Sequence, residues 1–222
     1  MIKENLIKKS LLAITCGVIF TSGCSLKNSE SGDNKQSKEI AQENFNENLA
    51  ADMVAETLPL YQKNRDLISI SNITDFGDGY IFLMKFTGDG AGISLYYTEN
   101  KDGKWIIGKS CKSEMAMSPG IRINTVVLED KMIVYGDVGT YTYIPETDEQ
   151  KNIDFAQIKL ISEDGKETVV DVHNDSQFLK VCNIFDVKSW SVSDKNKNEI
   201  LNPKSEMGKG VYENIKEMND YV

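Results

Sequence analysis

Apolar positions between residues 39 and 59 recur at steps of mostly four residues, which is a spacing of one helical face. These positions are Ile40, Phe45, Leu49, Met53, Val54 and Leu58. Glutamates occupy the opposite face, and Pro59 disfavours helical geometry at the residue before it. The pattern predicts one N-terminal amphipathic helix over 39–59. We expect it to pack on a domain, because a membrane surface would repel its acidic face.

From Leu67 onward the apolar period changes to two, which indicates β-strands. Short alternating runs are separated by glycine- and aspartate-rich turns, such as Gly77-Asp78-Gly79 and Lys101-Asp102-Gly103. The run Tyr80–Phe86 is almost wholly apolar, which is typical of a strand that is covered on both faces. The pattern predicts an antiparallel β-meander over 60–118.

A second set of short β-like runs follows Pro119 and Gly120. The runs are residues 121–128, 132–138, 158–161, 168–172, 178–182 and 187–192. Strands at this spacing are typical of a sandwich or an open barrel rather than a parallel α/β sheet. We therefore expect a β-sandwich-like module over 119–205.

Near the end of the chain, Val211, Ile215 and Met218 have helical spacing and predict a short C-terminal helix within 206–222. The predicted fold class is therefore mainly β. It combines an antiparallel meander with a β-sandwich-like module, one N-terminal amphipathic helix and a short C-terminal helix.

A basic, apolar leader precedes these elements. Three lysines come before about ten mostly apolar residues (11–20), fewer than the roughly 20 that a membrane-spanning helix needs. The small residues Thr21-Ser22-Gly23 then lead to Cys24, whose thiol can accept a lipid. This segment resembles the lipobox of bacterial lipoproteins, with Thr21 where leucine is commonest. The alternatives are an ordinary secretory signal with an incidental cysteine, and an uncleaved core segment.

The resemblance implies that 1–23 is a signal peptide and that Cys24 carries a diacylglyceryl anchor. Residues 24–38 would be the lipidated cysteine and a flexible tether, since Leu26 is the single apolar residue between Ser25 and Lys38. The protein would lie at the cell membrane and face outside the cytoplasm.

Charge narrows the class of partner. The leader carries three lysines and one glutamate, so the remaining 199 residues carry a formal charge of −11. Such a surface repels nucleic acid and anionic lipid headgroups. We therefore expect no nucleic-acid partner, and attachment to the membrane through the lipid alone.

The cysteines suggest one cross-link. Cys16 leaves with the leader and Cys24 takes the lipid, so Cys111 and Cys182 remain. In an extracytoplasmic protein this pair is a disulfide candidate that closes a loop of about 70 residues, worth on the order of 4 kcal/mol. The alternative is two separate buried thiols.

One stretch of the second β set resembles a known type of module. Residues 157–172 contain a charged hairpin with an Asp164-Gly165 turn, and they are followed by 178–181 and 190–197. This pattern is similar to a β-rich module of uncharacterised cell-envelope lipoproteins of Gram-positive bacteria, although Lys197 stands where those modules more often have glycine. The resemblance implies an all-β extracytoplasmic domain and no activity.

The sequence offers little catalytic or metal chemistry. His173 is the only histidine, and its neighbours in the sequence do not make a triad, so we expect a solvated turn residue. The aspartates of the glycine-rich turns, Asp75, Asp78 and Asp89, lack the ligand offsets of a calcium-binding EF-hand loop. We expect no catalytic residues, no metal site and no cofactor.

Two patterns give functional hypotheses. Alternating tyrosines Tyr135, Tyr141 and Tyr143 predict an aromatic ligand-binding face, with sheet core as the alternative. The acidic loop at Glu146–Glu149 offers a carboxylate pair for sugar hydrolysis. The favoured hypothesis is a non-catalytic binding or adaptor module for an envelope protein or wall component. The alternative is a cell-envelope hydrolase. A solute receptor of a transporter is disfavoured, because such receptors need two α/β lobes.

Overall fold

The computed structural model describes residues 44–88, 92–113, 120–139, 141–144, 149–205, 208 and 210–220. The predicted leader, the lipobox with Cys24 and the tether lie outside the described residues. Within the described part, strands dominate, and the predicted mainly β class is confirmed.

The N-terminal helix begins later than predicted. Helix α1 spans Glu47–Thr57, after Asn46, whose side chain caps it by accepting a hydrogen bond from Leu49 N at 3.1 Å. Leu58 is extended, and α2 then starts at Pro59 and runs to Lys63 before the 3₁₀ turn η1 at Arg65–Leu67. The capping asparagine thus sets the helix start inside the apolar stripe.

The meander forms the first sheet, with strand order β1-β2-β3-β4-β15 and antiparallel pairing throughout. Its strands are β1 Ile68–Phe76, β2 Gly79–Phe86, β3 Gly92–Lys101, β4 Lys104–Ser113 and β15 Asn219–Asp220. The predicted double coverage of the apolar run is confirmed, since Ile81 to Met84 are each at most 1% exposed. Alternate residues of β2 pack on α1 or on the next sheet.

The second β set divides into two sheets. The middle sheet has the order β11-β6-β5-β14, and the third sheet has the order β10-β9-β12-β13. The middle strands are β5 Ile121–Leu128, β6 Lys131–Val138, β11 Ser176–Asn183 and β14 Tyr212–Glu217. The third-sheet strands are β9 Phe155–Ser162, β10 Glu167–Asp171, β12 Val187–Asp194 and β13 Glu199–Leu201. A separate hairpin pairs β7 Tyr141–Ile144 with β8 Glu149–Asn152.

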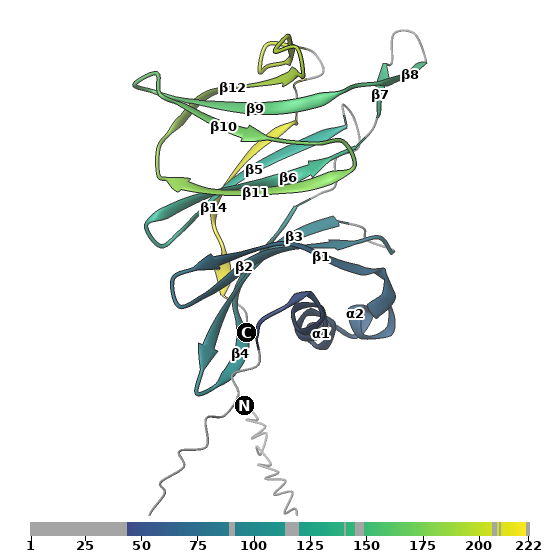
Figure 1. Ribbon diagram of the computed structural model, residues 1–222, viewed down its shortest axis with the longest axis vertical. Coiled ribbons are helices and arrows are strands. Elements are labelled where there is room, and N and C mark those ends of the chain that lie inside the picture. Colours follow the sequence, from purple (N-terminus) through teal and green to yellow (C-terminus); the bar gives the residue numbers. More distant parts are fainter. Residues whose placement is uncertain are drawn as a thin grey trace, which may run out of the picture. The chain divides into compact units, whose positions relative to one another are not determined.

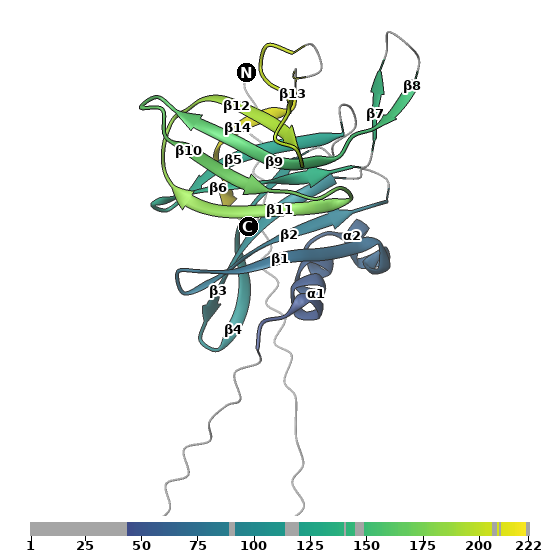
Figure 2. The same cartoon turned by 45° about the horizontal axis from the view of Figure 1, so that its top comes forward.

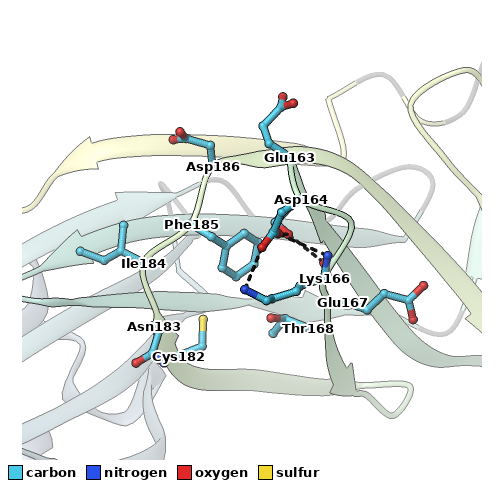
Figure 3. A pocket seen from close by; sticks show the side chains of 11 residues that line it. Glu163, Asp164, Lys166, Glu167, Thr168, Cys182, Asn183, Ile184, Phe185 and Asp186 are labelled. Atoms are coloured by element: carbon cyan, nitrogen blue, oxygen red, sulfur yellow. Dashed lines mark hydrogen bonds and ion pairs between the residues drawn. The ribbon is translucent and has the colours of Figure 1, made fainter.

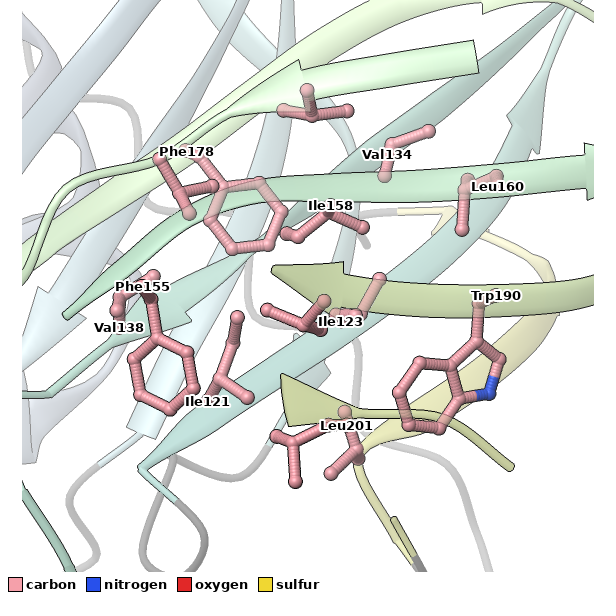
Figure 4. Close-up of a cluster of buried hydrophobic side chains, with 14 of the residues drawn as sticks. Ile121, Ile123, Val134, Val138, Phe155, Ile158, Leu160, Phe178, Trp190 and Leu201 are labelled. Atoms are coloured by element: carbon pink, nitrogen blue, oxygen red, sulfur yellow. The ribbon is translucent and has the colours of Figure 1, made fainter. Parts of the chain in front are cut away.

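The helices and the three sheets stack in four layers (Figure 1). The turned view in Figure 2 shows the same succession from α1 and α2 through the first and middle sheets to the third sheet. The middle sheet buries both faces because successive residues of a strand point to opposite sides. Val126, Ile133 and Tyr135 pack on the first sheet. Ile123, Val134 and Phe178 pack on the third sheet around Ile158 and Trp190 (Figure 4).

The predicted C-terminal helix is wrong. The segment instead forms β14, which lies parallel to β5, and β15, which pairs with β4. A bulge lies between Ile215, which pairs with Val126, and Glu217, which pairs with Val127. Because a bulge shifts the alternation by one residue, Ile215 and Met218 both face the core between the first and middle sheets. That shift produced the three-residue step from Ile215 to Met218, whereas Val211 packs in the other core, between the middle and third sheets.

Arg122 fixes the start of this C-terminal segment. Its Nη1 donates to the carbonyl oxygen of Gly210 at 2.5 Å, and its Nη2 forms an ion pair with Glu213. On the other face of β5, Thr125 Oγ1 and Tyr212 Oη lie 2.9 Å apart in a hydrogen bond. Residues 210–220 therefore connect the middle sheet to the first sheet.

Candidate functional site

A cavity of about 670 Å³ lies at one end of the β-sandwich, where the third and middle sheets part. The turn from β9 to β10 forms one wall, and the link from β11 to β12 forms the other (Figure 3). Its volume falls within the roughly 300–1,000 Å³ that is usual for ligand sites. The lining residues are Ser162, Glu163, Asp164, Lys166, Glu167, Thr168, Cys182, Asn183, Ile184, Phe185 and Asp186.

The hairpin wall of the cavity has a tight turn with a defined local cause. Gly165 has φ +80°, a backbone conformation that residues other than glycine rarely adopt, so glycine is suited to this position. Ser162 N donates to Lys166 O at 3.0 Å and closes the turn, and Gly165 N donates to Ser162 O at 3.0 Å. The turn thus holds Glu163 and Asp164 at the rim.

The opposite wall is apolar. Phe185 is half-buried and packs against the core between the middle and third sheets, whereas Ile184 is 51% exposed at the mouth. In Figure 3 the ring of Phe185 lies between the link and the hairpin turn, and Ile184 points away from the hairpin. Ile184 therefore adds exposed apolar area at the mouth of the cavity.

Lysines pair with three of the four rim carboxylates. Lys166 Nζ lies 2.7 Å from Asp164, Lys188 Nζ 3.5 Å from Glu163, and Lys159 Nζ 3.1 Å from Glu167. The hydrogen bond from Lys166 is the main cause that lowers the pKa of Asp164 to about 2, and the hydroxyl of Ser162 adds to it.

The fourth rim carboxylate differs from the other three. Asp186 is exposed and has no ion pair to any residue in the described ranges. With the three paired lysines counted, the four rim carboxylates leave one negative charge without an ion pair among the described residues, that of Asp186.

The cavity floor contains the thiol of Cys182. Its Sγ donates to Met132 O at 3.5 Å, and burial raises the pKa of this thiol. The disulfide candidate Cys111–Cys182 is not bridged in the structure, where both cysteines are free thiols. Cys182 packs on the side of the middle sheet that faces the third sheet, whereas Cys111 lies on the opposite side. The middle sheet separates the two sulfur atoms.

The predicted aromatic ligand-binding face is not formed by Tyr135. This residue is fully buried between the first and middle sheets, and its Oη lies 3.2 Å from Cys111 Sγ. Tyr141 and Tyr143 lie on β7, and their side chains fall outside the described part. The core alternative therefore holds for Tyr135.

The remaining candidates give no catalytic cluster. His173 is exposed in the turn between β10 and β11, where its carbonyl oxygen accepts a hydrogen bond from Ser176 at 2.5 Å. Of the acidic-loop carboxylates, Glu146 and Asp148 lie outside the described residues, and only the backbone of Glu149 is described, on β8. Among the described residues, no group of three or more histidine, cysteine or acidic side chains could hold a metal ion. No helix in those ranges is long and apolar enough to cross a membrane.

The cavity could not be predicted from the sequence, although the sequence contains one local signal of it. Two of the three residues that link β11 to β12 are apolar, Ile184 and Phe185, whereas links between strands are usually polar. A pair of this kind indicates packing or binding outside the regular strands.

Comparisons with known proteins add no relative. No protein-family model matches the chain, and neither curated proteins nor solved structures give a match.

Proposed function

We propose that this chain is a membrane-anchored extracytoplasmic lipoprotein that acts by binding, as a non-catalytic module of the cell envelope. The cavity beside Ile184 is its binding site, for an envelope protein or a wall component. The observation that carries the binding proposal is the combination of a ligand-sized cavity with an apolar wall, formed by Phe185 and Ile184. The anchoring proposal rests on the leader and on Cys24.

The alternative of a hydrolase gains no support from the cavity carboxylates. A general acid needs a pKa raised toward the working pH, whereas the pKa of Asp164 is lowered. The pKa of the Cys182 thiol is raised by burial, which lowers the fraction of reactive thiolate. Binding therefore fits the described chemistry better than catalysis.

Anchoring is tested by replacing the lipid acceptor. Cys24→Ala should abolish labelling by a radioactive fatty acid and release the protein from the membrane fraction. Cys182→Ala is the matched control and should retain both label and membrane attachment. Undiminished labelling of the Cys24→Ala protein would exclude the lipid anchor.

Binding is tested in cells with a photoreactive phenylalanine analogue at position 184. We expect a discrete cross-linked adduct from this position, because its side chain is exposed at the cavity mouth. The same analogue at Leu60, which is 45% exposed in the helix layer, is the control. Equal adducts at the two positions, or none at 184, would contradict the proposal.

A further inference from the structure

We infer that the cavity takes a lysine- or arginine-bearing segment of a partner peptide. The cationic head would lie against Asp186 and Glu163, and the aliphatic stem would lie against Phe185 and Ile184. This inference rests on the proposed binding function and names the chemical class of the ligand.

The apolar wall selects a ligand with a hydrocarbon part. Phe185 presents its ring to the cavity, and Ile184 extends the apolar surface to the mouth (Figure 3). Covering the apolar surface of these two residues is favourable.

The rim selects positive charge. Asp186 has no ion pair to a described residue, and the lysines that pair with Glu163 and Asp164 are 58% and 84% exposed. Exposed ion pairs of this kind are weak, so a ligand cation can replace either lysine at little cost. Lysine and arginine are the side chains that join a cationic head to an apolar stem. The charge of −11 on residues 24–222 favours encounter with a basic partner.

A peptide fits better than a free amine because a strand edge begins at the cavity. β10 is an edge strand of the third sheet. The backbone hydrogen bonds from Ser162 N to Lys166 O and from Val172 N to Ala156 O show that the even-numbered residues of β10 point their backbone N–H and C=O groups toward β9. The alternation of antiparallel strands therefore turns the backbone of Glu167 outward. A short extended segment can pair there. Lys180 Nζ donates a hydrogen bond to Val169 O at 2.7 Å, so this carbonyl already has a partner and a peptide strand can pair only before it.

The thiol of Cys182 is a built-in reporter of cavity occupancy. It lines the cavity, whereas Cys111 is 6% exposed between two sheets and serves as an internal unreactive control. The anchored protein purified in detergent is alkylated with N-ethylmaleimide, and peptide mass spectrometry gives the rate at each cysteine. Capped tetrapeptides that alternate leucine with lysine, glutamine or glutamate are added as competitors, together with free 1,5-diaminopentane.

We expect the lysine peptide alone to slow alkylation of Cys182. Asp186→Asn should weaken this protection by about two- to fivefold, the range for one exposed ion pair. Asp175→Asn, in the turn at the other end of β10, is the matched control and should leave protection unchanged.

Two results, besides an absence of protection by the lysine peptide, would overturn the inference. Equal protection by the three peptides would make the site apolar without charge selection, and equal protection by diaminopentane would exclude the peptide. Either could occur while position 184 still gives a cross-link, in which case the proposed binding function would stand. Alkylation of Cys24 would instead refute the lipid anchor and leave the cavity result intact.

Discussion

Arg122 gives the sharpest test of how the C-terminal segment is held. Its side chain is 18% exposed and bonds to Gly210 O, two residues before β14, and to Glu213, the second residue of β14. Arg122→Ala removes both interactions and leaves the geometry of β5 otherwise unchanged. We expect β14 and β15 to loosen from the middle and first sheets.

The magnitude follows from the two bonds. A hydrogen bond from a charged donor contributes about 1.5–3 kcal/mol, and the ion pair to the half-exposed Glu213 adds about 0–1 kcal/mol. Glu213 can be solvated after the change, so no charge is left buried. The expected loss is therefore about 2–4 kcal/mol, or roughly 4–16 °C at the 2–4 °C per kcal/mol usual for this chain length.

The assay compares thermal unfolding of Arg122→Ala with that of Arg65→Ala. Arg65 pairs with Asp52 on the helix layer, and both side chains are well exposed, so its loss should cost at most about 1 kcal/mol. Hydrogen exchange should also rise in β14 only for Arg122→Ala. Equal melting shifts for the two variants, or unchanged exchange in β14, would refute the role of Arg122.

Three further predictions concern single positions. Burial raises the pKa of Cys111 from 9.0 to about 11, so the protonated thiol stabilises the fold fully below pH 9 and this stabilisation is lost by about pH 11. Between those pH values the free energy of unfolding of the parent, measured in urea titrations, should therefore fall by up to about 2–3 kcal/mol more than that of Cys111→Ala. An equal fall in the two proteins would contradict this. Gly136→Ala places a Cβ 1.9 Å from Arg122 O and should cost about 3 kcal/mol or more, while Gly139→Ala, with 3.6 Å to its nearest atom, should melt like the parent. Asn46→Ala should cost about 1 kcal/mol by removing the cap of α1, and an unchanged melting temperature would exclude that role.

The meander could be predicted because its determinants are local. Its strands show apolar alternation or, in β2, an almost unbroken apolar run, and Asp102-Gly103 marks the turn between β3 and β4. The start of α1 also has a local cause, the Asn46 cap, but the apolar stripe continued upstream at Ile40 and obscured it.

Long-range features could not be predicted in the same way. The C-terminal strand has a bulge after Ile215, so Ile215 and Met218 face the same core although they are three residues apart, a step typical of a helix. The failure of the Cys111–Cys182 bridge depends on which face of which sheet each thiol occupies. The cavity depends on how the sheets part near Ile184, and spacing along one chain carries no such information.

The parallel pairing of β14 with β5 sets an order of assembly. The meander can form one hairpin at a time, but one edge of β5 stays unpaired until β14 docks and Tyr212 pairs with Ile123. Contacts between such distant segments form slowly, because the loop between them must first be closed. Until then β5 presents a bare strand edge, which is the part of a nascent sheet most prone to pair with another copy. The time during which this chain is vulnerable to aggregation is therefore the delay before residues 212–217 dock.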